Sequence, residues 1–448
     1  MEFSDLNLKR LLAEFPVLSK TGYLKAEERL QKLKQLAVEL NLIPKNTEVF
    51  HIAGTSGKGS TTMILSKLLQ VVEPRVGIFL SPFIVNVEES FQINNKPVSS
   101  KDLSSAIDFL ISNINTCRTQ FLPSFFEAKV LLALHLFQKA NCTAVCLEVG
   151  LGGRLDGTNI IDQKTCIINR LGYDHTEVLG NTLEQIAFEK AGIIKNKNLV
   201  IALKTTELSF AVIKKVADKH SAELIVVDPK LVKPQILGIN RVQFEYTTLD
   251  QKKLKLELSQ SGEYQAVNAY LALKAFEYYL AKKDLKIIDF KDKIRSQLSS
   301  IKMIGRFNIL KFKAKTVILD SAHNVQKLSY FIQSLQKLYP RQRFCFILSV
   351  KDSKDSLSII KLLKPVAKKL YYFTYEQEGG IKSHSYDQIK QFANKFNMPI
   401  NYIDQSKVED LIDASQDQIF VITGSMYGLS EILKNNKGIY RSLIQELI

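Results

Sequence analysis

One stretch near the N-terminus limits the possible folds more than any other part of the chain. It reads "EVFHIAGTSGKGSTTMILSKLLQ" over residues 48 to 70. An apolar run leads into a Gly-rich loop that carries a Lys, and an amphipathic pattern follows the loop. This order predicts a strand, a phosphate-binding loop and a helix that starts at Ser60.

The loop has the chemistry of an anion site. Backbone amides at the start of a helix, together with the positive end of its dipole, bind phosphate, and glycines let the phosphate approach closely. Only two residues separate Gly54 from Gly57, fewer than in the usual GxxxxGK[ST] loop. The alternative is a tight turn without a ligand. We expect a nucleotide site formed by Gly54, Thr55, Gly57, Lys58, Gly59, Ser60 and Thr61.

Short apolar runs continue beyond this loop and alternate with helical patterns. Residues 5–43 have apolar spacing typical of a helix, and further helices are expected to start at Ser124 and Thr182. The strands are predicted near 49–53, 76–80, 144–149, 166–171, 199–203 and 223–227. Strands and helices in this order predict an α/β fold with a largely parallel, P-loop ATPase-like sheet covered by helices on both faces.

A second region begins where this pattern changes. Alternating apolar and polar residues near 232–260 predict a small antiparallel sheet, and a helix follows it. Strand and helix patterns resume at "TVILDSA", "RFCFILSV", "LYYFTY" and "QIFVITGS". We predict an N-terminal ATP-binding domain over 1–298, which includes the antiparallel sheet, and a C-terminal Rossmann-like α/β domain over 299–448.

Composition favours a globular, multidomain enzyme. The 448 residues include five Cys without CxxC spacing, which we expect to be buried thiols. No signal peptide or membrane span is recognisable, so a cytoplasmic protein without membrane partners is expected. The net charge of +16 would suit nucleic acid or anionic substrates. Because Lys is spread along the chain, we favour the anionic substrates and expect no nucleic-acid partner.

Polar residues follow several of the predicted strands. In open α/β sheets, ligands bind at the carboxyl ends of the strands, where Ser81, Glu148 and His175 are expected together with Lys58. Taken singly, Ser81 could cap a turn, Glu148 could pair with an Arg, and His175 could be a loop residue. Hydroxyl and carboxylate oxygens at one edge predict a Mg²⁺ site, to which Ser60 could also contribute.

Other candidates are weaker when taken alone. "VGLGGRLDGTNII" directly follows Glu148 and should keep Arg154 and Asp156 near the bound phosphates or metal, unless it is an ordinary Gly-rich connection. Spacing alone favours a solvated Lys190. In the C-terminal half, Asp320 could bind a ribose hydroxyl and Arg306 a phosphate. The six scattered His contain no HxH or HExxH motif, which argues against a metallohydrolase.

The motifs together resemble the folylpolyglutamate synthase and dihydrofolate synthase family of the Mur ligase superfamily. The resemblance runs from about residue 48 to 430. It rests on "HIAGTSGKGS", "LSPFIVNVEESFQIN", "SFFEAKVLLALHLF", "CLEVGLGGRLDGTNII", "GYDHTEVLGNTLEQIAFEKAGIIK", "YQAVNAYLAL", "GRF", "ILDSAHN", "SVKDSKD" and "VITGSMYGLSEI". The short GKGS loop is itself the form that this family uses.

The resemblance assigns expected roles to particular positions. Gly57 to Ser60 would hold the ATP phosphates, and Asn268, Arg306 and Asp320 would contact ATP. Lys190 matches a lysine that the family carbamylates, which would steady the second of two Mg²⁺ ions, and His323 lies near the same site. The expected catalytic residues are Lys58, Glu148, His175, Lys190 and His323. The expected magnesium ligands are Ser60, Ser81, Glu148 and His175. The expected substrate-side residues are Ser81, Pro82, Phe83, Phe126, Glu127, Arg154 and Asp156.

The chain departs from the family pattern at several positions. Ser56 stands where the family usually has Asn, and Phe83 stands where it has His. Glu88, Glu89 and Ser90 stand where the family has an acidic-basic pair, and DSAHNV replaces DGAHNP. The changes within residues 81–94 fall in the family's substrate-side region, so the choice of acceptor stays open. A non-catalytic relative is one alternative.

The resemblance implies an ATP-dependent amide ligase acting as a monomer. It would join L-glutamate to dihydropteroate or a reduced folate through an acyl phosphate. A cell-wall precursor ligase and a basic, nucleotide-dependent nucleic-acid-binding protein are the remaining alternatives. Salt-sensitive binding to DNA or RNA would identify the latter.

Overall fold

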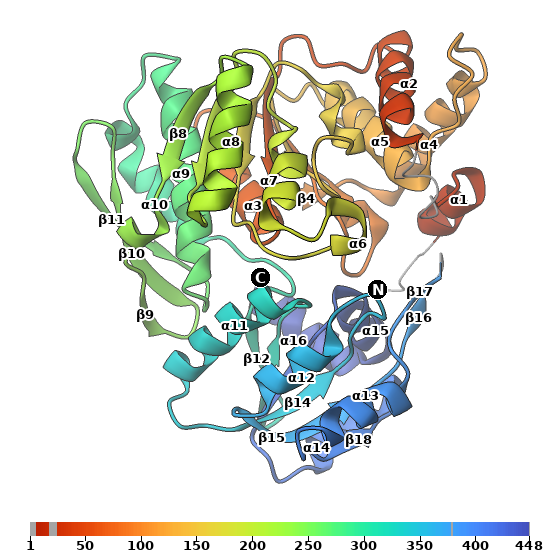
Figure 1. The fold of residues 1–448 in the computed structure, drawn as a ribbon, viewed down its shortest axis with the longest axis vertical. Helices are drawn as coiled ribbons and strands as arrows, with labels where there is room; N and C mark the ends of the chain where they lie inside the picture. Colours follow the sequence, from red (N-terminus) through yellow and green to blue (C-terminus); the bar gives the residue numbers. More distant parts are fainter. Residues whose placement is uncertain (1–5, 18–24, 378–379, 448) are drawn as a thin grey trace. The chain divides into compact units, whose positions relative to one another are not determined.

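The computed structural model describes residues 6–17, 25–377 and 380–447 (Figure 1). It divides into two compact units. Unit 1 comprises residues 1–233, 245–256 and 267–299, and unit 2 comprises residues 234–244, 257–266 and 300–448. The predicted domain boundary at 298/299 remains a prediction. The chain passes between the two units more than once between residues 233 and 300, because residues 234–244 and 257–266 belong to unit 2 and residues 245–256 to unit 1.

Unit 1 is built on an eight-stranded sheet with the strand order β4-β3-β2-β5-β1-β6-β7-β8. The strands are β1 (Glu48–Ala53), β2 (Val76–Phe79), β3 (Phe91–Ile93), β4 (Lys96–Pro97), β5 (Ala144–Glu148), β6 (Thr165–Ile168), β7 (Leu199–Leu203) and β8 (Glu223–Val227). The six predicted strands are present, and they pair in parallel. The short strands β3 and β4 add an antiparallel edge that the sequence did not reveal, so the sheet is mixed.

The helices of this region cover both faces of the sheet. They are α1 (Leu6–Glu14), α2 (Ala26–Glu39), α3 (Lys58–Leu69), α4 (Ser100–Ile114), α5 (Phe125–Lys139), α6 (Thr176–Leu179), α7 (Leu183–Ala191), α8 (Glu207–Lys219), α9 (Tyr264–Ala281) and α10 (Lys291–Ser299). Val49 joins the core under α5, whereas the next residue, Phe50, packs on Tyr279 of α9 with ring centroids 5.6 Å apart. Neighbouring residues of a strand therefore serve opposite layers.

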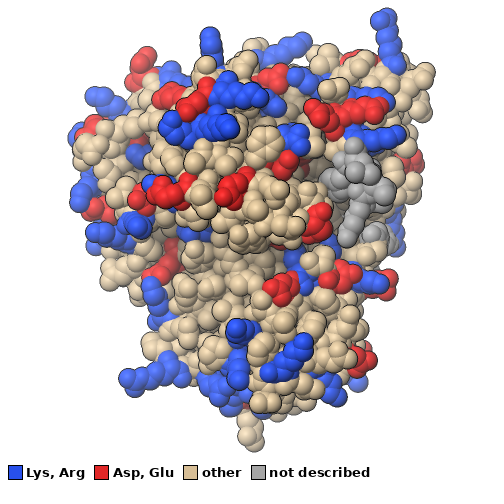
Figure 2. Space-filling model, in the orientation of Figure 1, with Lys and Arg blue, Asp and Glu red and all other residues tan. Residues whose placement is uncertain are grey.

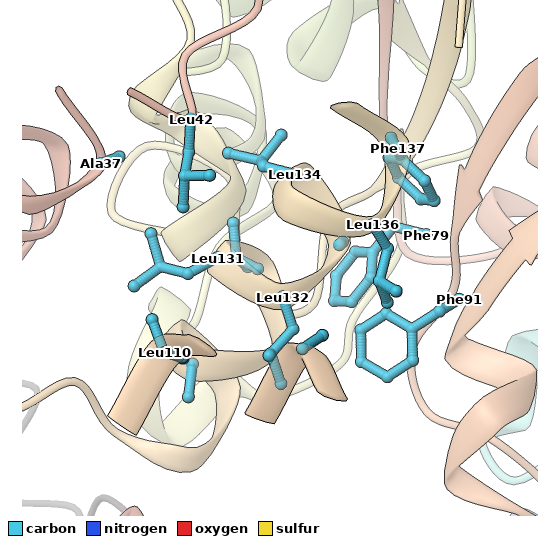
Figure 3. Packing of buried hydrophobic residues seen from close by; sticks show 14 of the residues in the cluster. Ala37, Leu42, Phe79, Phe91, Leu110, Leu131, Leu132, Leu134, Leu136 and Phe137 are labelled. Carbon is cyan, nitrogen blue, oxygen red and sulfur yellow. The ribbon is translucent and has the colours of Figure 1, made fainter. Parts of the chain in front are cut away.

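The core beneath α5 shows how this layer is filled. Leucines of α5 face Leu110 of α4 and the aromatic rings at the ends of β2 and β3 (Figure 3). Phe79 and Phe91 are fully buried, with ring centroids 6.0 Å apart. This packing fixes the end of β2, from which the turn at Ser81 emerges.

The prediction of a helix over residues 5–43 is partly wrong. The structure has two helices, and α1 ends at Glu14, two residues before Pro16. A residue that precedes Pro is disfavoured in helical conformation, which explains the break at Phe15. Residues 18–24 of the predicted helix lie outside the described residues.

The predicted antiparallel sheet is present as β9 (Gln235–Gly238), β10 (Arg241–Thr247) and β11 (Lys253–Leu258), in the order β11-β10-β9. Alternate residues of β10 are buried, namely Val242, Phe244 and Tyr246. The alternating pattern in the sequence therefore reflects one buried face.

Unit 2 contains a six-stranded sheet in the order β12-β13-β19-β14-β15-β18. Its strands are β12 (Asn308–Phe312), β13 (Lys315–Leu319), β14 (Phe344–Leu348), β15 (Ala367–Tyr372), β18 (Ile400–Tyr402) and β19 (Ile419–Thr423), and a separate hairpin is formed by β16 (Glu376–Gln377) and β17 (Ile381–Lys382). The helices are α11 (Val325–Leu338), α12 (Ser356–Leu363), α13 (Tyr386–Asn394), α14 (Val408–Ala414), α15 (Met426–Asn435) and α16 (Lys437–Leu447). All neighbouring strands are parallel except β12, an unpredicted strand that pairs antiparallel with β13. Each of the two large sheets thus belongs to an α/β unit, as predicted.

Charged side chains are dispersed over the visible surface, with acidic residues among the basic ones (Figure 2). Four of the five cysteines are buried, as predicted, whereas Cys117 is partly exposed. Within the described residues, no helix combines the length and apolar character needed to cross a membrane.

Candidate active site

The Gly-rich loop connects β1 to α3 as predicted, but α3 begins at Lys58 rather than at Ser60. Gly57 is the N-cap residue and has φ of 84°, a left-handed conformation that glycine adopts without strain. Because glycine has no side chain, it leaves the first-turn amides of α3 without a side-chain cap. Uncapped amides at a helix start are suited to binding an anion.

Two asparagines enclose the loop. A Cβ added to Gly57 would lie 2.3 Å from Asn268 Oδ1 and 2.5 Å from Asn169 Nδ2, so only glycine fits there. Asn169 Nδ2 donates hydrogen bonds to Thr61 Oγ1 at 2.8 Å and to Asn268 Oδ1 at 2.9 Å. Asn169 therefore ties the loop, α3 and α9 together. Its place directly after β6 was a usable sequence signal, which the prediction passed over.

Backbone hydrogen bonds hold the outer part of the loop. The amides of Thr55 and Ser56 donate to the carbonyl of Arg170 at 2.8 and 3.2 Å. Lys58 Nζ donates to the Gly54 carbonyl at 3.2 Å, so its ammonium lies over the loop that it follows. The loop is thus held in shape by hydrogen bonds within unit 1.

The structure brings the turn at Ser81 to Glu148, as predicted. Glu148 is the last residue of β5 and is buried, and its Oε2 accepts a hydrogen bond from the Ser81 amide at 3.0 Å. A Cβ at Gly59 would lie 3.2 Å from the same oxygen. The Glu148 carboxylate therefore lies beside the first turn of α3, one residue from Ser60.

His175 lies directly before α6. It is the N-cap residue of α6 with φ of 50°. Its ring nitrogens lie 3.9 Å from Asp174 Oδ1 and 3.8 Å from Glu177 Oε1, with 37% of the side chain exposed. Both carboxylates lie beyond hydrogen-bonding distance of the ring. The role of His175 stays a prediction.

The segment after β5 places Asp156 close to the loop. Asp156 accepts from the Leu151 amide at 2.8 Å and from the Thr158 amide at 3.0 Å. Burial raises the pKa of Asp156, while these hydrogen bonds and the charge of Lys58 act in the opposite direction. Thr158 Oγ1 in turn lies 2.7 Å from Nε2 of the buried His51, so the carboxylate is positioned from inside the sheet.

Arg154 and Glu127 have structural partners. Arg154 binds Glu189 of α7 through Nε and an Nη atom, at 3.0 and 2.9 Å. Glu127 completes a capping box with Ser124 at the predicted start of α5 and also binds Arg29. Their substrate-side roles remain predictions, as does that of the nearby half-buried Phe126.

Lys190 lies on α7, which is capped by Thr182 as predicted. The expectation of a solvated side chain is wrong, because only 4% of Lys190 is exposed. The spacing was misleading because the loop after β5 packs against this turn: a Cβ at Gly153 would lie 3.0 Å from the Lys190 carbonyl. A carbamate on Lys190 remains a prediction.

Sequence reasoning also missed Lys129 of α5. It is 2% exposed, and its Nζ lies over the rings of Phe79, Phe83 and Phe125. Burial lowers the pKa of Lys129 to about 7, with the Glu148 charge acting in the opposite direction. The burial of Lys129 could not be predicted from the sequence, because its neighbours in α5 are apolar and a lone lysine among them is normally exposed.

Unit 2 contains a separate group, the Asp320 cluster, which we define as the predicted residues Arg306 and Asp320 together with Tyr264, which was not predicted. Asp320 accepts from the Phe307 amide at 2.9 Å, the Ala322 amide at 2.7 Å and the Tyr264 hydroxyl at 3.3 Å. Burial raises the pKa of Asp320 to about 6, against the opposing effect of Arg306. The structure thus brings Arg306 and Asp320 together, while their expected contacts with ATP remain predictions.

His323 follows the cluster, and both of its ring nitrogens have partners. Its Nδ1 lies 2.8 Å from the Ser321 carbonyl and must donate, because a carbonyl only accepts. Nε2 lies 2.9 Å from Lys327 Nζ and accepts from that ammonium.

The residues around Glu148 suit a Mg²⁺ ion that is bound mainly by the phosphates of a nucleotide. Within the described ranges, no group of three or more His, Cys, Asp or Glu side chains is arranged to hold a metal ion. Mg²⁺ that is bound to phosphates needs only one or two carboxylates, with water and hydroxyl oxygens completing the shell. Glu148 beside Gly59 and the Ser81 turn fits that limited donor set.

Comparison with known proteins agrees with this architecture. Residues 52–276 match the model of the Mur ligase middle domain. The dihydrofolate synthase/folylpolyglutamate synthase of Bacillus subtilis is 28% identical over 418 residues, covering 91% of this chain and 95% of that protein. The dihydrofolate synthetase of Saccharomyces cerevisiae is also 28% identical, over 426 residues, covering 90% of this chain and 97% of that protein.

The folylpolyglutamate synthase of Mycobacterium tuberculosis, solved with ADP and AMPPCP, has a similar fold. It matches with a TM-score of 0.82 and 24% identity over 95% of this chain and 96% of that chain. Fold and loop together define a Mur-type ligase. The chain belongs to the Mur ligase family and, within it, to the folylpolyglutamate synthase/dihydrofolate synthase family.

Proposed function

We propose that the protein is an ATP-dependent ligase of folate metabolism that joins L-glutamate to dihydropteroate or a reduced folate. The observation that carries the proposal is the junction of three elements in unit 1. The uncapped first turn of α3, the Glu148 carboxylate and the Ser81 turn meet within hydrogen-bonding or van der Waals distance. This junction combines an anion site with the carboxylate that a nucleotide-bound cation requires.

The reaction must first activate a carboxylate. A carboxylate is a poor electrophile, so transfer of the γ-phosphoryl group of ATP to it forms an acyl phosphate and releases ADP. The amine of glutamate then attacks the carbonyl carbon, loses a proton and displaces inorganic phosphate. No protein nucleophile is needed, and the protein acts by positioning and by stabilising charge.

The residues of the loop supply the first of these functions. The amides at the start of α3 would bind phosphate oxygens, and Lys58 would exchange its contact with the Gly54 carbonyl for the phosphate charge. Thr61 is held by Asn169 and therefore keeps the first turn of α3 fixed as the nucleotide binds. Asn268, which contacts the same asparagine, links the loop to α9.

Mg²⁺ would be held by Glu148, Ser60 and Ser81, with His175 as a further candidate, and would supply charge neutralisation at the phosphates. Two such ions are expected, with Lys190 in its carbamylated form supporting the second. In unit 2, Asp320 and Arg306 would contact ATP. Asp320 is oriented for this by two backbone amides.

A coupled assay for ADP tests the proposal. Release of ADP should require an acceptor and L-glutamate together, and a comparison of dihydropteroate with tetrahydrofolate will identify the acceptor. Glu148→Ala should abolish turnover without unfolding the protein. An enzyme that releases no ADP with either acceptor would contradict the proposal.

A further inference from the structure

The feature that the proposed function does not use is the buried charge of Lys129. Its Nζ lies 5.3 Å from the centroid of the Phe83 ring and 5.7 Å from those of Phe79 and Phe125. Only 2% of the residue is exposed. The ammonium is therefore held in an aromatic box formed by these three rings.

The aromatic box lies at the ligand-binding end of the sheet. Phe79 is the last residue of β2, and Phe83 belongs to the turn that follows it. Between them, Ser81 donates its amide to Glu148 at the end of β5. Phe125 is the first residue of α5, whose next residue, Phe126, packs against Gly150 just beyond β5. Open α/β sheets bind their ligands at this end of the strands.

The charge of Lys129 is incompletely satisfied by the protein. Among the described residues, Lys129 Nζ has neither a hydrogen bond nor an ion pair, only the three ring faces and the more distant charge of Glu148. Ring faces attract a cation but do not replace the oxygen partners that its N–H groups lose on leaving water. Lys164 is also a buried lysine with its pKa lowered to about 7, but it has such a partner, Asn159 Oδ1 at 2.7 Å.

We propose that Lys129 is a substrate-binding residue that contacts the carboxylate of an acidic acceptor, carried on a flat aromatic group that packs against Phe83 and Phe125. This assignment rests on the proposed function, because it concerns the acid that the ligase activates. A carboxylate oxygen would supply the missing hydrogen-bond partner for the ammonium. The half-buried rings of Phe83 and Phe125 provide apolar faces for the flat group.

The test compares an acid with its neutral analogue. Inhibition or binding constants would be measured for pteroic acid and for pteroic acid carboxamide with the wild-type protein and with Lys129→Met and Lys129→Gln. We expect the wild-type protein to bind the acid at least tenfold more tightly than the carboxamide, and both variants to lose that preference. The KM for ATP should stay within about twofold. Lys129→Met should not lower the thermal midpoint, because it removes a buried charge and keeps the length of the side chain.

Lys164→Met is the matched control, because it removes a buried lysine of the same unit that already has a partner. It should lower the thermal midpoint and keep the preference for the acid. Retention of that preference in Lys129→Met and Lys129→Gln would overturn the assignment of Lys129. Absence of turnover in the wild-type protein would instead contradict the proposed function, so the two failures are distinguishable.

Discussion

The loop over residues 54–61 and the Asp320 cluster are both expected to contact the nucleotide, yet they are built differently. The loop presents backbone amides, and its shape depends on the left-handed conformation of Gly57. The Asp320 cluster presents a buried side chain, which backbone amides from Phe307 and Ala322 hold in place. The first site requires glycine in a particular conformation, whereas the second requires a carboxylate to be desolvated.

This difference predicts how each site responds to substitution. A change of side chain in the loop should act through sterics and should have little dependence on pH. A change at Asp320 should act through protonation and should alter the pH dependence of stability. Four experiments would break or sharpen this contrast.

The largest effect is expected for Gly57→Ala. The new Cβ would lie within 2.5 Å of two side-chain atoms, of Asn169 and Asn268, in a backbone conformation unfavourable for alanine. We expect the free energy of unfolding to fall by about 2–4 kcal/mol and ADP release to fall by more than about a thousandfold. Denaturant unfolding and the coupled assay would measure these changes.

Gly380→Ala is the matched control for this experiment. Gly380 has a similar φ of 74°, but nothing lies within 4 Å of its Cβ position. It should cost only about 1–2 kcal/mol, the strain of the left-handed conformation itself. Equal losses for the two variants would show that packing against the asparagines does not matter.

Lys58→Met should affect activity rather than stability. Removal of the charge that meets the phosphates should lower the turnover rate by about 100- to 1,000-fold. Stability should change by less than about 1 kcal/mol, because the side chain makes one hydrogen bond, to the Gly54 carbonyl. Lys67→Met, at the other end of α3, is the control for loss of a positive charge and should retain activity. Steady-state kinetics would measure both variants, and equal turnover rates would contradict a phosphate-binding role for Lys58.

The third experiment uses the raised pKa of Asp320, about 6 in the folded protein against an ordinary value of 3.8. The unfolded chain releases this proton first as pH rises, so the stability that the group contributes is present below about pH 4 and is lost by about pH 6 and above. The shift of about two units corresponds to about 3 kcal/mol at most. The urea midpoint of the wild-type protein, followed from pH 4.5 to 7.5, should contain a decline that Asp320→Asn lacks.

Asp417 in the same unit provides a control of opposite sign. Lys368 and Lys369 hold its pKa well below the ordinary value, so the stability that it contributes is lost as pH falls. The stability of the wild-type protein should therefore fall at low pH as Asp417 is protonated, and Asp417→Asn should lack this fall. If Asp320→Asn changed the midpoint equally at every pH, a protonation role for Asp320 would be excluded.

The smallest effect is expected for Ser56→Asn, which introduces the residue that the family usually has. Ser56 is fixed by its backbone amide, which donates to the Arg170 carbonyl at 3.2 Å, and this contact does not depend on the side chain. We expect KM for ATP to change by less than about threefold, or about 0.7 kcal/mol. A larger change in the kinetic assay would show that the side chain at this position takes part in nucleotide binding.

The same contrast explains which features were predictable from the sequence. Helix starts at Ser124 and Thr182, and the glycines of the loop, follow from local capping and conformational preferences. The buried parallel strands follow from their continuous apolar runs. These features depend on residues close together in the sequence.

Other features depend on contacts between distant residues. Asn169 acquires its role only because β6 lies beside β1, and a loop that follows β5 packs against the turn of α7 that contains Lys190. Strands β3 and β4 are too short to give a periodic signal. The aromatic box around Lys129 unites β2, a turn and α5, and no single stretch of sequence contains it.

The central claim, activation of a carboxylate by phosphoryl transfer, can be tested with isotopically labelled acceptor. The carboxylate of the acceptor would be labelled with ¹⁸O and incubated with the enzyme, ATP and L-glutamate, and the inorganic phosphate analysed by mass spectrometry. An acyl phosphate intermediate transfers one labelled oxygen to each phosphate released, and we predict that transfer. Amide product accompanied by unlabelled phosphate would contradict the account.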